Sequence, residues 1–147
     1  MGQTSEVSQA ADPFIGTWEL NLEKSEFEPS SSAPRITTRT VEDRGDGLFL
    51  VTRHGINAQG NRSFAQYAYK RDGKDYPIAE LGAQTAYSIS IRRVDAHTEE
   101  FTVKSDGRWV STGTTTISGD GKTMTRNRRG TNEQGQETTS VQVYERR

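Results

Sequence analysis

Apolar and polar residues alternate along much of this chain, and a period of two predicts β-strands. The first alternating segment puts four apolar residues on one face: Phe14, Trp18, Leu20 and Leu22. Three later segments alternate in the same way, with apolar residues Tyr87, Ile89 and Ile91, then Phe101 and Val103, then Val141 and Val143. We expect these apolar faces to point inward. Residues 114–116 and 123–129 show little contrast, which is typical of strands around a polar lumen.

Six pairs of a polar residue followed by glycine divide the chain and predict hairpin turns. They are Asp46-Gly47, Gln59-Gly60, Asp72-Gly73, Asp106-Gly107, Asp120-Gly121 and Gln134-Gly135. Their glycines are separated by 13, 13, 34, 14 and 14 positions, and the long gap holds another turn-like stretch at 95–98. A chain that reverses this regularly has long strands, which are typical of a barrel meander.

The segments between the turns are rich in strand-favouring residues, including eighteen threonines. They predict nine strands, at residues 14–22, 35–44, 48–57, 62–71, 85–94, 99–105, 109–118, 123–131 and 137–146. Residues 75–84 are expected to form a tenth, irregular strand or a flap. Residues 23–34 are expected to form a loop, because Pro29 and Pro34 exclude a long helix or a central strand. The predicted fold class is therefore all-β, a single antiparallel up-and-down β-barrel of about 8–10 strands.

Length and composition fit one soluble domain with a thin or partly polar core. The chain has 147 residues, of which 30% are hydrophobic, and a net charge of -1. Its 19 basic and 20 acidic residues create no field that would attract nucleic acid. No apolar run approaches the roughly 18 residues of a membrane span. The absence of cysteine excludes disulfides, thiolate catalysis and cysteine metal sites.

Residues 1–12 lack the apolar run of a complete signal peptide, and they predict a flexible tail before a domain at 13–147. Such a tail is typical of the mature end of an exported protein, although a cytoplasmic protein with a frayed end has the same pattern. A periplasmic or secreted location is favoured, and a cytoplasmic one stays open.

Short motifs stand at both ends of the chain and between them. The first is Phe14-Ile15-Gly16-Thr17-Trp18-Glu19-Leu20, and the last is Val141-Gln142-Val143-Tyr144-Glu145-Arg146. The first resembles the opening strand of the calycin superfamily, and the last is similar to the closing strand of fatty-acid-binding proteins. With the runs 72–77 and 120–125, residues 13–146 resemble bacterial lipocalin-like domain proteins. The resemblance implies a lipocalin-like barrel with adjacent first and last strands and a small hydrophobic or amphipathic ligand.

The chain departs from this resemblance at one position of the ligand site. Many fatty-acid-binding proteins have an Arg two residues before the last-strand Tyr, and the two grip the ligand carboxylate; here that position is Gln142. Gln142 and Tyr144 are expected to hydrogen-bond a neutral or hydroxylated ligand. Arg126 and Arg128 would supply the missing charge if they turned inward. The alternative is that both coat the outside of a polar strand.

The remaining candidates are aromatic residues and one histidine. Gly16, Trp18 and Arg146 are expected to be structural, with Trp18 closing the barrel floor under Arg146. Tyr67 and Tyr87 suit a ligand cavity; Tyr87 shares a face with Ile89 and Ile91, whereas for Tyr67 either face of its strand could be inside.

His54 alternates with Leu48, Leu50 and Ile56, so we expect it to point inward. A buried, hydrogen-bonded histidine is the simplest interpretation, and a ligand-binding or acid–base role is the alternative. His97 falls in a turn, and two distant histidines do not predict a metal site. No cofactor is expected.

Three functions follow from these observations. Binding or carriage of a small molecule in the lumen is favoured. A lumenal acid–base enzyme of the isomerase or cyclase type, using His54 or an inward carboxylate with a tyrosine, is the first alternative. An extracytoplasmic interaction module with a filled lumen is the second. The chain has no nucleophile elbow and no phosphate loop, so an enzyme is the less expected outcome.

Overall fold

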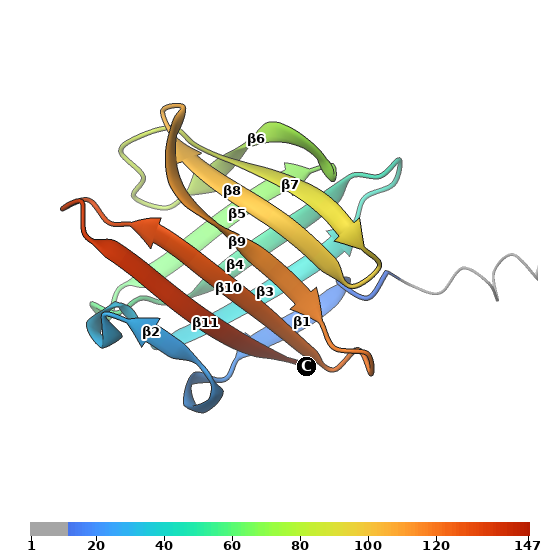
Figure 1. Ribbon diagram of the computed structural model, residues 1–147, viewed down its shortest axis with the longest axis horizontal. Helices are drawn as coiled ribbons and strands as arrows, with labels where there is room; N and C mark the ends of the chain where they lie inside the picture. Colours follow the sequence, from blue (N-terminus) through green and yellow to red (C-terminus); the bar gives the residue numbers. More distant parts are fainter. Residues whose placement is uncertain (1–11) are drawn as a thin grey trace, which may run out of the picture.

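A computed structural model describes residues 12–147, so the predicted tail, except Asp12, lies outside the described residues. The described chain forms one antiparallel sheet that curls into a barrel (Figure 1). Its strands are β1 (Gly16–Leu20), β2 (Glu26–Glu28), β3 (Ile36–Asp43), β4 (Phe49–Ile56), β5 (Arg62–Tyr69), β6 (Asp72–Glu80), β7 (Tyr87–Asp95), β8 (Thr98–Ser105), β9 (Arg108–Ile117), β10 (Thr123–Thr131) and β11 (Glu137–Arg146). Two short 3-10 helices, η1 (Leu22–Lys24) and η2 (Ser30–Ser32), flank β2. Within residues 12–147, no helix is long and apolar enough to cross a membrane.

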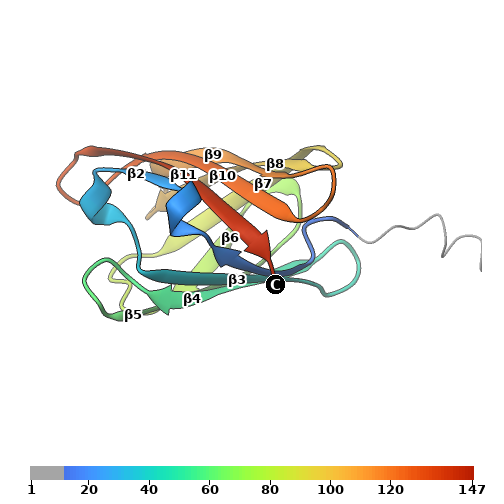
Figure 2. The same cartoon turned by 90° about the horizontal axis from the view of Figure 1, so that it is seen from below.

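The barrel closes because β11 pairs with β1. From β3 onward each strand pairs with the next in the sequence, which gives ten strands in the closed ring and confirms the predicted up-and-down barrel. Figure 2 shows the resulting layers, with β3, β4 and β5 on one side and β8 to β11 on the other. The eleventh strand, β2, pairs with the first half of β11, at residues 139–141.

The segment at 75–84, expected to be an irregular strand or a flap, falls mostly in strand β6, whose pairing with β7 shifts register between Asp72 and Asp75. Asp72-Gly73 lies at the chain reversal between β5 and β6, since Ala65 pairs with Glu80 and Gln66 with Ala79. The segment expected to be a loop contains β2, because three residues before Pro29 are enough to pair with the free edge of β11. The other five predicted turns are present, each with its glycine at a φ between 75° and 87°, a conformation that favours glycine.

An apolar core fills one end of the barrel, which we call the closed end. Trp18 is 0% exposed and donates from Nε1 to the Phe14 carbonyl at 3.0 Å. The Arg146 guanidinium lies 4.3 Å from the centre of the Trp18 ring and donates to the carbonyls of Pro13 and Ile15. Gly16 leaves room for this arrangement, since its φ is 141° and a Cβ there would lie 2.3 Å from Arg146 Nη1. These contacts tie both ends of the barrel chain together.

A buried ionic cluster also lies at the closed end. Arg71 donates from Nη1 and Nη2 to both carboxylate oxygens of Asp12, at 2.6 and 3.0 Å, and from Nε to Glu99. Its guanidinium also lies 4.1 Å from the Phe49 ring centre and 5.0 Å from that of Phe14. Burial alone would raise the pKa of Asp12, but hydrogen bonds from Arg71 and from the Phe14 amide hold it below its usual value. Asp12, predicted to end the tail, is therefore part of the barrel.

Candidate functional site

A cavity of about 600 Å³ occupies the half of the barrel away from the closed end. It extends to the turns that join β4 to β5, β6 to β7 and β10 to β11, where Asn57, Leu81 and Glu133 line it. Leu81 is 62% exposed, so the cavity meets solvent at this end, which we call the open end. The volume is in the range of sites for small organic molecules.

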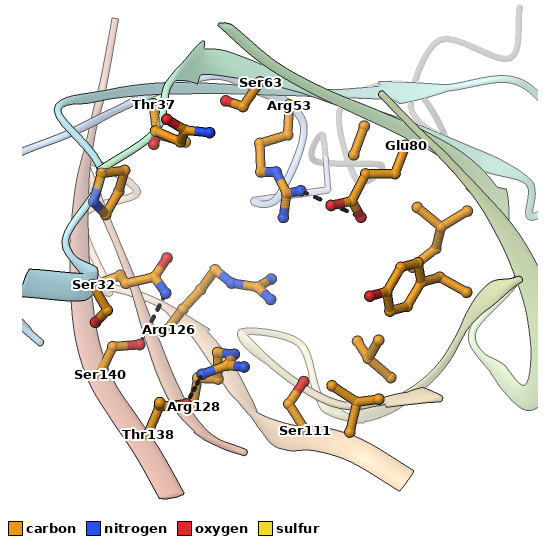
Figure 3. A pocket seen from close by; sticks show the side chains of 18 of the residues that line it. Ser32, Thr37, Arg53, Ser63, Glu80, Ser111, Arg126, Arg128, Thr138 and Ser140 are labelled. Atoms are coloured by element: carbon orange, nitrogen blue, oxygen red, sulfur yellow. Dashed lines mark hydrogen bonds and ion pairs between the residues drawn. The ribbon is translucent and has the colours of Figure 1, made fainter. Parts of the chain in front are cut away.

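The wall of this cavity has two chemically different parts. One part is polar and basic, and its arginines come from β3, β4, β5 and β10: Arg39, Arg53, Arg62, Arg126 and Arg128. The other part is largely apolar and comes from β6, β7 and β8: Ile78, Tyr87, Ile89, Phe101 and Val103. In Figure 3, Arg53, Arg126 and Arg128 point into the same space. A molecule in this cavity would meet positive charge on one side and hydrocarbon on the other.

Arg39 is the most deeply buried of these arginines, with 4% of its surface exposed. Its Nη2 donates to the Tyr67 hydroxyl at 2.9 Å, and its guanidinium lies 5.9 Å from the centre of the Tyr144 ring. Its Nε is buried and has no hydrogen-bond partner among the described residues. A buried donor without an acceptor is costly, so this nitrogen favours an acceptor that enters the cavity.

Arg126 lies on β10, on the same face as the core residue Met124. Its Nη1 donates to the Thr115 hydroxyl at 3.3 Å, and its guanidinium stacks 4.2 Å from the centre of the Phe101 ring. Burial, followed by the charge of Arg39, lowers its pKa to about 10. Within residues 12–147, neither Arg126 nor Arg39 forms an ion pair with a carboxylate. A buried positive charge on Arg39 and a half-buried one on Arg126 thus line the cavity without a counter-ion from the described chain.

Arg53 and Arg128 lie nearer the open end. Arg128 donates from Nη1 to the Thr138 hydroxyl at 3.0 Å, and burial, followed by the charge of Arg53, lowers its pKa. The contact between Arg53 and Glu80 is longer, at 3.9 Å, and both side chains are 37% exposed. Ion pairs that are this open to solvent contribute little. The positive charges of Arg53 and Arg128 are therefore also only weakly compensated.

The last strand turns its polar face to the cavity. Tyr144 donates to Gln142 Oε1 at 2.8 Å, and Gln142 Nε2 donates to the Ser140 hydroxyl at 2.9 Å. Val141 lies on the other face and is 37% exposed, so the expectation that the Val141 and Val143 face points inward is wrong. The inner face of β11 is polar here because Ser140 and Gln142 line the cavity, so hydrophobicity does not mark the inner face.

The two tyrosines named from the sequence lie at the cavity. Tyr67 is buried with 7% exposure, on the same face as Tyr69, which settles the open choice between the two faces of β5. Tyr87 lines the apolar part of the cavity wall, on the same face as Ile89. The structure thus places Tyr67, Tyr87, Arg126, Arg128, Gln142 and Tyr144 around one cavity.

His54 does not join them. Phe49, Val51 and Arg53 form the inner face of β4, so His54 points outward and is exposed. The expectation that it points inward is wrong, because both faces of β4 carry apolar side chains: Phe49 and Val51 on the inner face, Leu50 and Ile56 on the outer one. The acid–base alternative thereby loses its histidine. Among residues 12–147, no group of three or more histidines and acidic residues could hold a metal ion.

Three cavity arginines, Arg39, Arg53 and Arg62, were missed from the sequence. Arg39 and Arg53 are partners in the register between β3 and β4, so they lie side by side in the wall. The signal that could have found Arg39 is its period-two spacing from Thr37 and Val41, both buried. The residues around Arg53 gave no comparable signal, since both faces of β4 carry apolar side chains.

No protein-family model matches the sequence, and no curated protein does. Solved structures do match in shape. The ileal bile-acid-binding protein of zebrafish, complexed with cholic acid, superposes with a TM-score of 0.63 at 16% identity, covering 92% of this chain and 99% of that one. The N57A mutant of the fluorescent protein UnaG gives 0.62 at 16% identity, covering 94% and 99%. As-p18, an extracellular fatty-acid-binding protein, gives 0.58 at 13% identity, covering 92% and 97%.

At these identities the likeness concerns the fold alone. The ten-strand closed ring and the pairing of its first and last strands agree with the expectation drawn from the terminal motifs. The chain has the fatty-acid-binding-protein-like fold of the calycin barrels.

Proposed function

We propose that the protein binds a small amphipathic molecule in the barrel lumen and that the acidic group of this molecule sits between Arg39 and Arg126. One observation carries the proposal: the guanidinium groups of Arg39, which is buried, and Arg126, which is half-buried, line a cavity of about 600 Å³ without a carboxylate partner within residues 12–147. Burying a charge without a partner is expensive. A bound carboxylate would supply both the counter-charge and the acceptor for Arg39 Nε.

The cavity wall also supports this chemistry. The basic part is opposed by apolar side chains of Ile78, Ile89 and Val103, against which a hydrocarbon body can pack. The names of two structural neighbours agree with it, since one is a bile-acid-binding protein and another a fatty-acid-binding protein. The neutral or hydroxylated ligand expected from Gln142 is less well supported, because Tyr144 and Ser140 already occupy its amide.

The alternatives have weaker support. An interaction module with a filled lumen would have no room for a cavity of this size. An acid–base enzyme would need a base in the lumen, and the inward carboxylate Glu80 is instead near Arg53. Carriage between compartments, and a periplasmic or secreted location, stay predictions of the sequence.

Calorimetric titration with a matched pair of probes tests the proposal. We expect dodecanoate to bind at least about tenfold more tightly than dodecanol, because only the acid can pair with the guanidinium groups. Arg126→Gln should remove this preference and leave dodecanol binding unchanged. Arg129→Gln is the matched control, since Arg129 is exposed on the outer face of the same strand. Equal binding of both probes to the unchanged protein would refute the proposal.

A further inference from the structure

The cavity holds more positive charge than one acidic group can neutralise. Five arginines line it, namely Arg39, Arg53, Arg62, Arg126 and Arg128, against two glutamates, Glu80 and Glu133. Only one of the ion pairs within residues 12–147 joins members of this set, the 3.9 Å contact between Arg53 and Glu80. A single carboxylate between Arg39 and Arg126 would leave the charges of the other arginines uncompensated.

These arginines lie at two depths. Strand β10 runs from the closed end, where Met124 is 2% exposed, to the open end, where Thr131 lines the cavity rim. Arg126 is therefore the inner arginine and Arg128 the outer one, separated by two residues, or about 7 Å along the strand. On the facing wall the same order holds, since Arg39 is 4% exposed whereas the Arg53 side chain is 37% exposed.

The two walls also interact across the lumen. Arg39 and Arg53 are register partners on one face, and like charges in that position repel. The charge of Arg39 acts on Arg126, and that of Arg53 acts on both Arg126 and Arg128. Figure 3 shows Arg53, Arg126 and Arg128 directed into one space, with Thr138 as the hydrogen-bond partner of Arg128. The arrangement is an inner pair and an outer pair of cations around the same cavity.

We infer that the ligand carries two acidic groups roughly 5–7 Å apart, close to the two-residue repeat of a strand. Arg39 and Arg126 hold the inner group, and Arg53 and Arg128 hold the outer one. The apolar body lies against the wall formed by Ile78, Ile89 and Val103. This inference rests on the proposed function and narrows its ligand from a monoacid to a diacid.

Calorimetry with 2-decylglutarate and its monoamide tests this inference, because the two probes have the same size and differ by one charge. We expect the diacid to bind the unchanged protein at least about tenfold more tightly than the monoamide. Arg128→Gln should lower diacid affinity at least about tenfold and monoamide affinity much less, because the diacid loses a charged hydrogen bond and the monoamide only a neutral-acceptor one. Arg53→Gln should act in the same direction, and it provides a second variant at a more exposed position. Arg129→Gln should change neither affinity.

The possible results separate this inference from the proposed function. If diacid and monoamide bind equally well, or if Arg128→Gln weakens both to the same extent, the two-group ligand is refuted and lumenal binding of an acid stands. If neither probe binds the folded protein at millimolar concentration, the proposed function fails and this inference fails with it. Circular dichroism of each variant establishes that a loss of binding does not come from unfolding.

Discussion

Replacing Arg126 with methionine should make the ligand-free protein more stable while it removes the binding of acids. Burial lowers the pKa of Arg126 to about 10, which corresponds to a penalty of about 3 kcal/mol on its charged form. Against this, the variant loses the contact with the Phe101 ring at 4.2 Å, about 1 kcal/mol, and the bond to Thr115 at 3.3 Å, about 1 kcal/mol. Methionine keeps most of the apolar stem. The balance is a gain of about 1 kcal/mol.

Urea unfolding of the ligand-free protein measures this gain directly, and thermal unfolding should show a rise in Tm of roughly 3 °C. Dodecanoate binding, measured on the same samples, should fall at least about tenfold. The control is Arg129→Met on the outer face of β10, where the guanidinium lies 5.9 Å from the Trp109 ring centre. Its effect on stability should stay within about 0.5 kcal/mol.

Two results would refute this reasoning about Arg126. A loss of stability above about 1 kcal/mol would mean that the charge of Arg126 stabilises the ligand-free barrel, which contradicts a charge that only a ligand compensates. Unchanged dodecanoate binding would mean that the acid sits elsewhere. A more stable variant that no longer binds acids is the only combination consistent with both halves of the argument.

Three further predictions concern the closed end and the outer surface. Gly16→Ala should lower the free energy of unfolding in urea by about 2–3 kcal/mol, because the new Cβ would collide with Arg146 and the backbone φ is 141°. A change below about 0.5 kcal/mol, as for a surface substitution, would contradict the close approach of Arg146 to Gly16. Asp12→Asn should cost about 1–3 kcal/mol at pH 7 by removing a charged partner of Arg71. The folded-state pKa of Asp12 is lowered, so its contribution to the free energy of unfolding is present above its ordinary pKa of 3.8 and is lost as the pH falls through the folded-state pKa. The free energies of unfolding of the two proteins, measured in urea, should therefore converge below pH 3.8. A difference that stays constant with pH would argue against the ion pair. His54→Ala should leave dodecanoate affinity within about twofold, and a tenfold loss, about 1.4 kcal/mol, would return His54 to the binding site.

The turns and strands could be predicted because their cause is local. Gly47, Gly60, Gly107, Gly121 and Gly135 all adopt positive φ, and a polar–glycine pair at such a position marks a chain reversal whatever the tertiary context. Asp72-Gly73 has the same local chemistry, and Gly73 also has a positive φ of 78°. It too lies at a chain reversal, the one between β5 and β6, and the pairing of β6 with β7 shifts register just after it.

The inward faces could be predicted only where the interior is apolar. Trp18 at the closed end, and Ile89 and Phe101 in the apolar wall of the cavity, are inside, as their alternation indicates. Along β4 and β11 the inner face includes polar residues and the outer face apolar ones, so hydrophobicity does not distinguish the two faces. The errors at Val141 and His54 have this common origin.

Pairings that are distant in the sequence could not be predicted at all. Arg71 lies 59 residues from Asp12 and 28 from Glu99, and nothing in the local pattern joins them. The same is true of Arg39, whose partner Tyr67 is 28 residues away. Such contacts require the register of the sheet, which alternation alone does not provide.

The arginines inside this barrel differ in whether a carboxylate compensates their charge, and this difference favours a ligand in the lumen. Arg71 has two carboxylates and two aromatic rings around it. Arg39 and Arg126 have tyrosine, threonine and aromatic contacts but no carboxylate within residues 12–147. A fold that fully compensates one buried arginine at its closed end can compensate others. An acidic residue in the lumen would lower the free-energy cost of burying Arg39 and Arg126, but it would also compete with an acidic ligand for them. A binding site for acids therefore requires that their contacts include no carboxylate of the described chain.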